Sequence, residues 1–137
     1  WETIQLFFDS VKKLSLTWDE QAALGYALSD GMREIVRNAY QDVTTNLPLA
    51  VAEIRKLNPD AEILLLGYYN PAWILPTWNN YFNQLRRFER QLAKDMGLTY
   101  VDITWTAVDN DAHPSIAGHR YIGSQITKAI RKLDVLD

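Results

Sequence analysis

The two histidines of the sequence, His113 and His119, lie in one short segment whose acidic residues could support acid–base chemistry. Asp109 and Asp111 precede His113 by four and two residues, and a Pro-Ser pair follows it directly. A carboxylate that orients one ring nitrogen of a histidine leaves the other nitrogen free to take a proton from a nucleophile. His113 is therefore a candidate general base. The competing interpretation is a solvated loop histidine or a residue that caps a helix.

Thiol and metal chemistry find no support in the sequence. The chain has no cysteine, which excludes disulfides, thiol catalysis and thiolate metal sites. Two histidines six residues apart, without a supporting pattern of acids, do not make a metal site. We therefore expect neither a metal ion nor a cofactor.

Around the histidines the sequence predicts an α/β fold with parallel strands. The short apolar segment 61–67, bounded by turn residues, is typical of a buried strand, and segment 98–103 predicts a second one. A helix is predicted between them over 79–96, and another follows over 115–133. His113 then lies at a loop-to-helix junction beyond a strand end, which is where open α/β sheets bind ligands.

Apolar spacing predicts which faces of these helices are buried. The inward face of the 79–96 helix is expected to carry Phe82, Leu85, Phe88, Leu92 and Met96. The corresponding face of the last helix is expected to carry Ile116, Ile122, Ile126 and Ile130. The basic residues of the 79–96 helix are expected to form a solvated face, made of Arg86, Arg87, Arg90 and Lys94.

The first part of the chain predicts helices only. Apolar spacing predicts a helix over 2–14, and Thr17 with Glu20 forms a capping box that begins a second helix. The segment 44–48 could start a further helix, because proline is tolerated in a first turn, or could kink a continuing one. The buried stripe of this region is expected to consist of Leu47, Val51, Ile54 and Leu57.

The block His113-Pro114-Ser115-x-x-Gly118-His119 resembles the C-terminal block of the SGNH, or GDSL-type, lipase and esterase superfamily. Residues 57–71, an apolar strand followed by an Asn-Pro loop, are similar to the strand and loop before that block in bacterial SGNH lipase/acylhydrolases. Together the two matches cover about residues 44–133. The resemblance implies a three-layer α/β/α sandwich with a parallel sheet, flavodoxin-like in architecture, and serine-type ester hydrolysis.

The resemblance also implies roles for single residues. His113 would be the general base of a Ser-His-Asp arrangement, and His119 would be structural. The family's acid most often lies three residues before the histidine, where this chain has Asn110. Asp111 is therefore the first candidate for the orienting acid and Asp109 the second, and a backbone carbonyl could orient the ring instead.

The loop after the first predicted strand supplies the candidate substrate-binding residues. Tyr69 and Trp73 could line an acyl or aryl pocket, although aromatic residues pack loops in any α/β protein. Asn70 does not match the family's Gly-x-Asn block, and we expect it to shape the loop that lines the site.

The family's nucleophile, which belongs to an N-terminal Gly-Asp-Ser block, is not recognisable in this sequence. Asp9-Ser10 has a phenylalanine in place of the glycine and lies within helical periodicity, so Ser10 is expected on a helix surface. By this alignment the 137 residues form one domain that is the C-terminal portion of a hydrolase, with 1–43 as a helical insertion and 44–137 as the part that carries the histidine block. The alternative is a pseudo-hydrolase or interaction module that lacks the nucleophile.

Composition and charge bear on partners. A net charge of −3 argues against a nucleic-acid binder, and the longest apolar run, 63–66 with its flanks, is far shorter than the roughly 18–20 residues that span a bilayer. The expected ligand is a small ester or acyl substrate. Since two strands make a poor sheet, the N-terminal part of the same protein or a second copy is expected to complete it. The resemblance implies an extracellular or cell-envelope location in a bacterium, with a cytoplasmic location left open.

Overall fold

The computed structural model describes residues 29–71, 76–109 and 112–133, which form three helices and a two-stranded parallel sheet. In chain order the elements are α3 (Asp30–Leu57), β1 (Leu64–Leu66), α4 (Pro76–Met96), β2 (Thr99–Val101) and α5 (Ile116–Lys132). The described part is mixed α/β and mostly helical, which confirms the predicted class and element order. The predicted helix over 2–14 and the predicted helix start at Thr17 lie outside the described residues.

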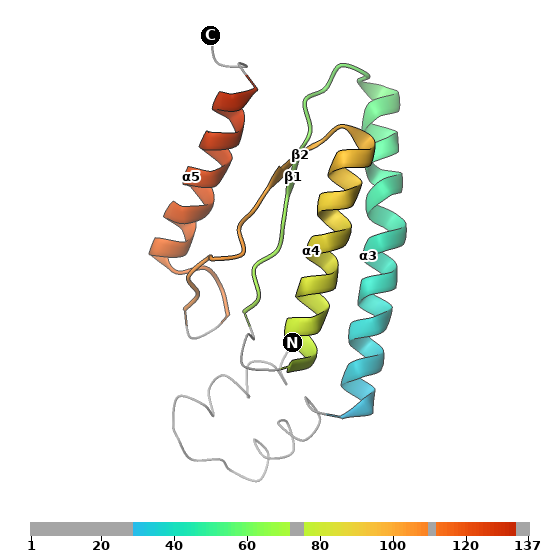
Figure 1. The fold of residues 1–137 in the computed structure, drawn as a ribbon, viewed down its shortest axis with the longest axis vertical. Coiled ribbons are helices and arrows are strands. Elements are labelled where there is room, and N and C mark those ends of the chain that lie inside the picture. The colour runs from blue at the N-terminus through green and yellow to red at the C-terminus, as the bar shows by residue number, and fades with distance from the viewer. Residues whose placement is uncertain (1–28, 72–75, 110–111, 134–137) are drawn as a thin grey trace.

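The sheet separates two apolar cores. Its parallel register pairs Leu64 with Thr99, Leu65 with Tyr100 and Leu66 with Val101. On one face Leu65 packs against Leu92 and Ala93 of α4, and on the other Val101 packs with Ile103 and Ala129 of α5. Side chains alternate across a strand, so neighbouring strand residues serve different faces. α4 and α5 therefore cover opposite faces of the sheet, and α3 packs against α4 (Figure 1).

α3 is a single helix that continues through Pro48, so the continuing-helix alternative for segment 44–48 is confirmed. The Thr44 hydroxyl donates to the Tyr40 carbonyl one turn earlier, at 2.9 Å. Val51 is buried, but Ile54 and Leu57 are 44% and 84% exposed, so the predicted stripe is wrong at its end. The C-terminal end of α3 extends past the end of α4, which is the described helix that packs against it (Figure 1).

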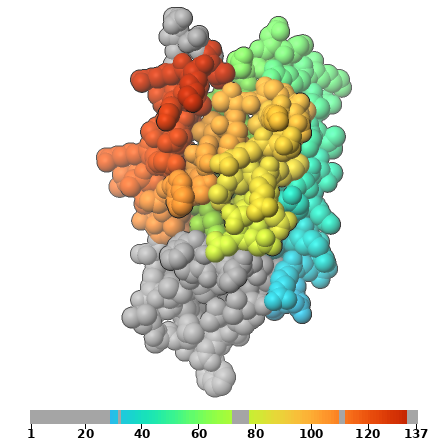
Figure 2. Space-filling view, in the orientation of Figure 1, coloured from blue at the N-terminus to red at the C-terminus, as the bar shows by residue number. Residues whose placement is uncertain are grey.

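α4 is amphipathic along the predicted stripe and lies in the middle of the face shown in Figure 2, with α5 on one side and α3 on the other. Leu85 is 1% exposed, and Phe82 and Leu92 are also buried. Gly97 ends the helix with a φ of 64°, a left-handed conformation that glycine adopts without steric cost. The stripe also contains Glu89, whose side chain is 0% exposed and which periodicity did not assign to the core.

α5 begins where predicted, at the Pro-Ser pair. Ser115 caps the helix by accepting a hydrogen bond from the Gly118 amide at 3.1 Å. Ile116 is 74% exposed, so its predicted inward position is wrong. At 3.6 residues per turn it lies about 120° around the helix from Ile122, which packs against the sheet.

Candidate functional site

His113 lies on the loop that leads from the carboxyl end of β2 to α5, and main-chain hydrogen bonds fix its backbone. The amide of Asp109 donates to the His113 carbonyl at 2.8 Å, and the amide of Ala112 donates to the Asp109 carbonyl at 3.1 Å. Val108 and Pro114 form an antiparallel bridge just outside this pair. Ala112 has a φ of 70°, an uncommon conformation for a residue with a side chain. These main-chain hydrogen bonds bring Asp109 and His113 together, and His113 is exposed.

The residues that follow His113 dock this loop onto α5. The amide of Ser115 donates to the Ala107 carbonyl at 2.9 Å, and its hydroxyl donates to the same oxygen at 3.2 Å. Gly118 packs so closely that a Cβ there would lie 2.1 Å from the Ala107 oxygen. Only glycine allows this approach. The serine and the glycine of the motif therefore have a structural role, whether or not the histidine is catalytic.

The two candidate acids differ in what the structure describes. Asp109 is exposed and is held next to His113 by the main-chain pairing of the loop. Asp111 lies outside the described residues, so its orienting role stays a prediction. His119 is exposed on the first turn of α5.

The loop after β1 reaches the histidine loop through Tyr69. Its ring packs against the core that contains Val101 and Ile103, and its hydroxyl donates to the Ala112 carbonyl at 3.2 Å. This contact joins the loops that follow the two strands, directly beside the histidine. Tyr69 is therefore placed to hold the backbone around His113, a positioning role that its predicted binding role did not include.

Asn70 turns toward α4 instead. Its amide nitrogen donates to the Asn79 side chain at 2.7 Å, and both residues line a cavity of about 600 Å³. Asn83 and Arg86 add polar groups to the wall of the cavity. Trp105, which is 81% exposed, lines the side that the loop after β2 forms. His113 and Asp109 are not among the residues that line it. The remaining predicted binding residue, Trp73, lies outside the described residues.

The polar wall of this cavity was missed from the sequence although a signal was present. Asn79, Asn83 and Arg86 recur at intervals of four and three, which places them on one helix face. Two carboxamides and a guanidinium in the N-terminal half of α4 form a wall rich in hydrogen-bond donors, opposite residues of the loop that follows β2. Such a wall suits an oxygen-rich ligand.

A buried carboxyl lies between α4 and the sheet. Both carboxyl oxygens of Glu89, the Tyr100 hydroxyl and Nε of Arg86 are buried without a hydrogen bond of regular geometry. Burial raises the pKa of Glu89 to about 7, and the nearby Tyr100 hydroxyl and Arg86 offset part of this effect. Burial, together with the negative charges of Glu89 and Asp102, raises the pKa of Tyr100 to about 12. Glu89 is therefore largely protonated below neutral pH.

The neighbours of this carboxyl are held by charged contacts at the sheet edge. Arg90 lies 5.5 Å from the centre of the Tyr100 ring and donates to Asp102 at 2.5 Å. Burial acts to raise the pKa of Asp102, but hydrogen bonds from Thr104 and Arg90 outweigh it and hold the pKa below its usual value. The predicted solvated face is thus wrong for Arg86, which is half-buried, while Arg87, Arg90 and Lys94 are exposed.

Within the described ranges, no group of three or more histidine, aspartate or glutamate side chains is arranged to hold a metal ion. No helix among the described residues combines the length and the apolar character needed to cross a membrane. Comparison with known proteins found no matching family model, no matching curated protein and no matching solved structure. The resemblance to SGNH hydrolases therefore rests on the sequence blocks alone and stays a prediction.

Proposed function

We propose that this chain supplies the histidine region of a serine-type ester hydrolase of the SGNH kind. The observation that carries the proposal is the setting of His113: an exposed imidazole on a tightly closed loop at the carboxyl end of a parallel strand. Ligands bind at this edge in open α/β sheets. A general base must also be held in place, and the main-chain pairing with Asp109 provides that rigidity.

In the proposed reaction a serine attacks the carbonyl carbon of an ester while His113 takes the hydroxyl proton. His113 then gives that proton to the leaving alcohol, and a water molecule repeats the sequence to release the acid. Asp111, or Asp109 behind it, orients the ring. Amide donors from other segments stabilise the oxyanion that forms.

Ser115 and Ser124 do not suit the nucleophilic role. Ser115 caps α5, and the Ser124 hydroxyl, within α5, donates to the Tyr121 carbonyl at 2.7 Å. A nucleophile needs a sharp strand-to-helix turn that exposes its oxygen. We therefore assign the serine to a further strand that pairs with the edge of β1 not occupied by β2. That strand would come from an N-terminal part of the same protein or from a second copy, and it would complete a three-layer sandwich.

The substrate proposed is a small ester or acyl compound, and an extracellular or cell-envelope location follows from the same resemblance. Asn70, with the other polar residues of the 600 Å³ cavity, would contact oxygen atoms of the substrate. Tyr69 would keep the histidine loop in register with it.

The experiment that tests the proposal is labelling with a fluorophosphonate probe, which reacts with activated serines. The gene's coding sequence upstream of Trp1 is expected to contain a Gly-Asp-Ser block, and the product that includes it is expected to be labelled, while the 137-residue chain is not. His113→Ala should abolish labelling and ester hydrolysis, and His119→Ala serves as the matched control. An upstream sequence without the block, or labelling that survives loss of His113, would contradict the proposal and favour a non-catalytic module.

A further inference from the structure

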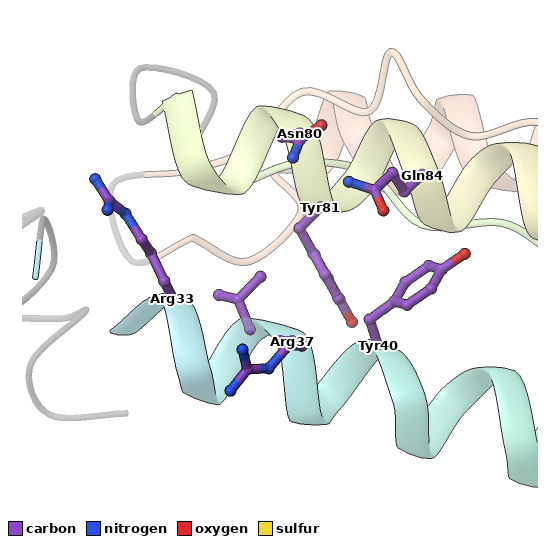
Figure 3. A pocket seen from close by; sticks show the side chains of 7 residues that line it. Arg33, Arg37, Tyr40, Asn80, Tyr81 and Gln84 are labelled. Carbon is purple, nitrogen blue, oxygen red and sulfur yellow. The ribbon is translucent and has the colours of Figure 1, made fainter. Parts of the chain in front are cut away.

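A second cavity, of about 340 Å³, lies between the N-terminal halves of α3 and α4 (Figure 3). α3 contributes Arg33, Arg37 and Tyr40 to its walls, and α4 contributes Asn80, Tyr81 and Gln84. Figure 3 shows Tyr81 reaching from α4 toward α3, with Arg33 at one end of the space and Tyr40 at the other. This volume is within the range of roughly 300–1,000 Å³ that small-molecule sites occupy.

The polar part of the cavity consists of hydrogen-bond donors. All six of these side chains can donate, and no carboxylate is among the described residues that line the cavity. Arg33 and Arg37 are one helical turn apart and therefore lie on the same side of α3. Both line the cavity, and each ends in a guanidinium group with a planar fork of donors.

The existing partners of these arginines are weak competitors. Arg33 contacts Asp30 at 2.8 Å and Arg37 lies 3.8 Å from Glu34, and every side chain in these two pairs is at least 65% exposed. Exposed ion pairs three residues apart on a helix add little to stability. A ligand with a higher negative charge can therefore take over the guanidinium groups without a large loss.

The rest of the cavity wall is apolar. Val36 is 8% exposed, and the rings of Tyr40 and Tyr81 meet edge to face with their centres 6.4 Å apart. Burial, together with the nearby Tyr68 and Glu89, raises the pKa of Tyr81 above its ordinary value of 10, so its hydroxyl keeps its proton and donates at neutral pH. The cavity thus places an aromatic and aliphatic wall beside a group of donors.

We propose that this cavity binds a small organic phosphate monoester. Its phosphate group would be held by Arg33 and Arg37, and its organic part would lie against Val36 and the two tyrosine rings. A phosphate group has three terminal oxygens that together accept several hydrogen bonds, and guanidinium groups bind it in a bidentate manner. A carboxylate offers two oxygens and would leave more of the donors unsatisfied.

This site is independent of the proposed hydrolase chemistry. The cavity lies between α3 and α4 on one side of the sheet, whereas His113 belongs to the loop that leads into α5 on the other (Figure 1). Either proposal can fail without affecting the other.

The test is isothermal titration calorimetry of the 137-residue chain at low ionic strength, with phenyl phosphate as the probe. Benzoate and phenol are the comparison ligands, since they keep the ring and change or remove the anion. We expect saturable binding of one phenyl phosphate per chain, benzoate weaker by about tenfold, and no measurable binding of phenol. Added salt should weaken the binding of phenyl phosphate.

Variants locate the site. The double substitution Arg33→Ala with Arg37→Ala should weaken phenyl phosphate binding by about tenfold or more, because it removes both charged donors. Arg120→Ala with Arg131→Ala, which removes two exposed arginines of α5, is the matched control and should leave the affinity unchanged. Tyr81→Phe keeps the ring, removes one donor, and should weaken binding a few-fold. Circular dichroism confirms that each variant is folded.

Four results would overturn the proposal. They are the absence of saturable binding, tighter binding of benzoate than of phenyl phosphate, unchanged affinity in the Arg33/Arg37 variant, and an equal loss in the Arg120/Arg131 control.

Discussion

Replacing Glu89 by glutamine isolates the consequence of burying an ionisable group between α4 and the sheet. The carboxyl is 0% exposed and has no hydrogen bond of regular geometry, and its pKa is raised from 4.5 to about 7. Glutamine has nearly the same shape and does not ionise. The variant therefore keeps the packing and removes the titration.

The direction of the pH effect follows from proton binding. Between pH 4.5 and about 7 the folded protein keeps a proton on Glu89 that the unfolded chain releases. The stability of the folded state therefore falls as the pH rises through this window. At 1.36 kcal/mol per pKa unit, the gap between the two pKa values amounts to at most about 3 kcal/mol by pH 8. The glutamine variant lacks this loss.

Urea unfolding followed by circular dichroism at pH 5, 6, 7 and 8 measures the effect. The free energies of unfolding of wild type and Glu89→Gln should lie within about 1 kcal/mol of each other at pH 5. By pH 8 the variant should be more stable, by up to about 3 kcal/mol. Glu62→Gln is the matched control, because Glu62 is exposed, and it should follow the wild type at every pH. Parallel pH profiles of wild type and Glu89→Gln would refute the reasoning.

Three further substitutions test other contacts. Tyr100→Phe removes a hydroxyl that lowers the pKa of the buried carboxyl in the folded state, so the fall in stability should continue to a higher pH and become larger in total, and an unchanged profile would contradict that contact. Gly118→Ala forces a methyl group to 2.1 Å from a main-chain oxygen and should lower the free energy of unfolding by about 1–3 kcal/mol. At Gly123 an added methyl group meets no atom of another element within 4 Å, so Gly123→Ala should stabilise α5 by about 0.5–1 kcal/mol. Leu85 is 1% exposed, so Leu85→Ala should lower the free energy of unfolding by about 2–5 kcal/mol. Leu57 is 84% exposed, so Leu57→Ala should change it by less than about 0.5 kcal/mol. Equal effects of the two glycine substitutions, or of the two leucine substitutions, would be inconsistent with the packing described.

The elements of the described fold could be predicted because their signals are local. Apolar segments between turn residues predicted both strands, and Gly97 and Ser115 marked a helix end and a helix start at the observed places. Exposure was harder, because it depends on what lies opposite. Ile54 fits the apolar period of α3 yet is 44% exposed, since the described elements leave it uncovered.

The candidate site also has features that the sequence predicted and features that depend on contacts between distant segments. The position of His113 after the second strand followed from element order, but the left-handed conformation of Ala112 did not, because alanine carries no preference for it. The contact between Tyr69 and the Ala112 carbonyl joins residues 43 positions apart and depends on the parallel register of the strands. Glu89 was missed because its charge suggested solvent, although its place between Leu85 and Leu92 on one face pointed to the core.

Two residues of the histidine block, Ser115 and Gly118, have a structural role in the loop. Ser115 caps α5 and Gly118 allows the Ala107 carbonyl to approach, so a non-catalytic protein with this loop would need both. His113 contributes its carbonyl to the loop, a group that any residue supplies, while its ring is exposed. The structure of the loop therefore accounts for the serine and the glycine of the motif. For that reason the hydrolase proposal depends on His113, and Ser115 and Gly118 cannot distinguish an enzyme from a module that keeps only the scaffold.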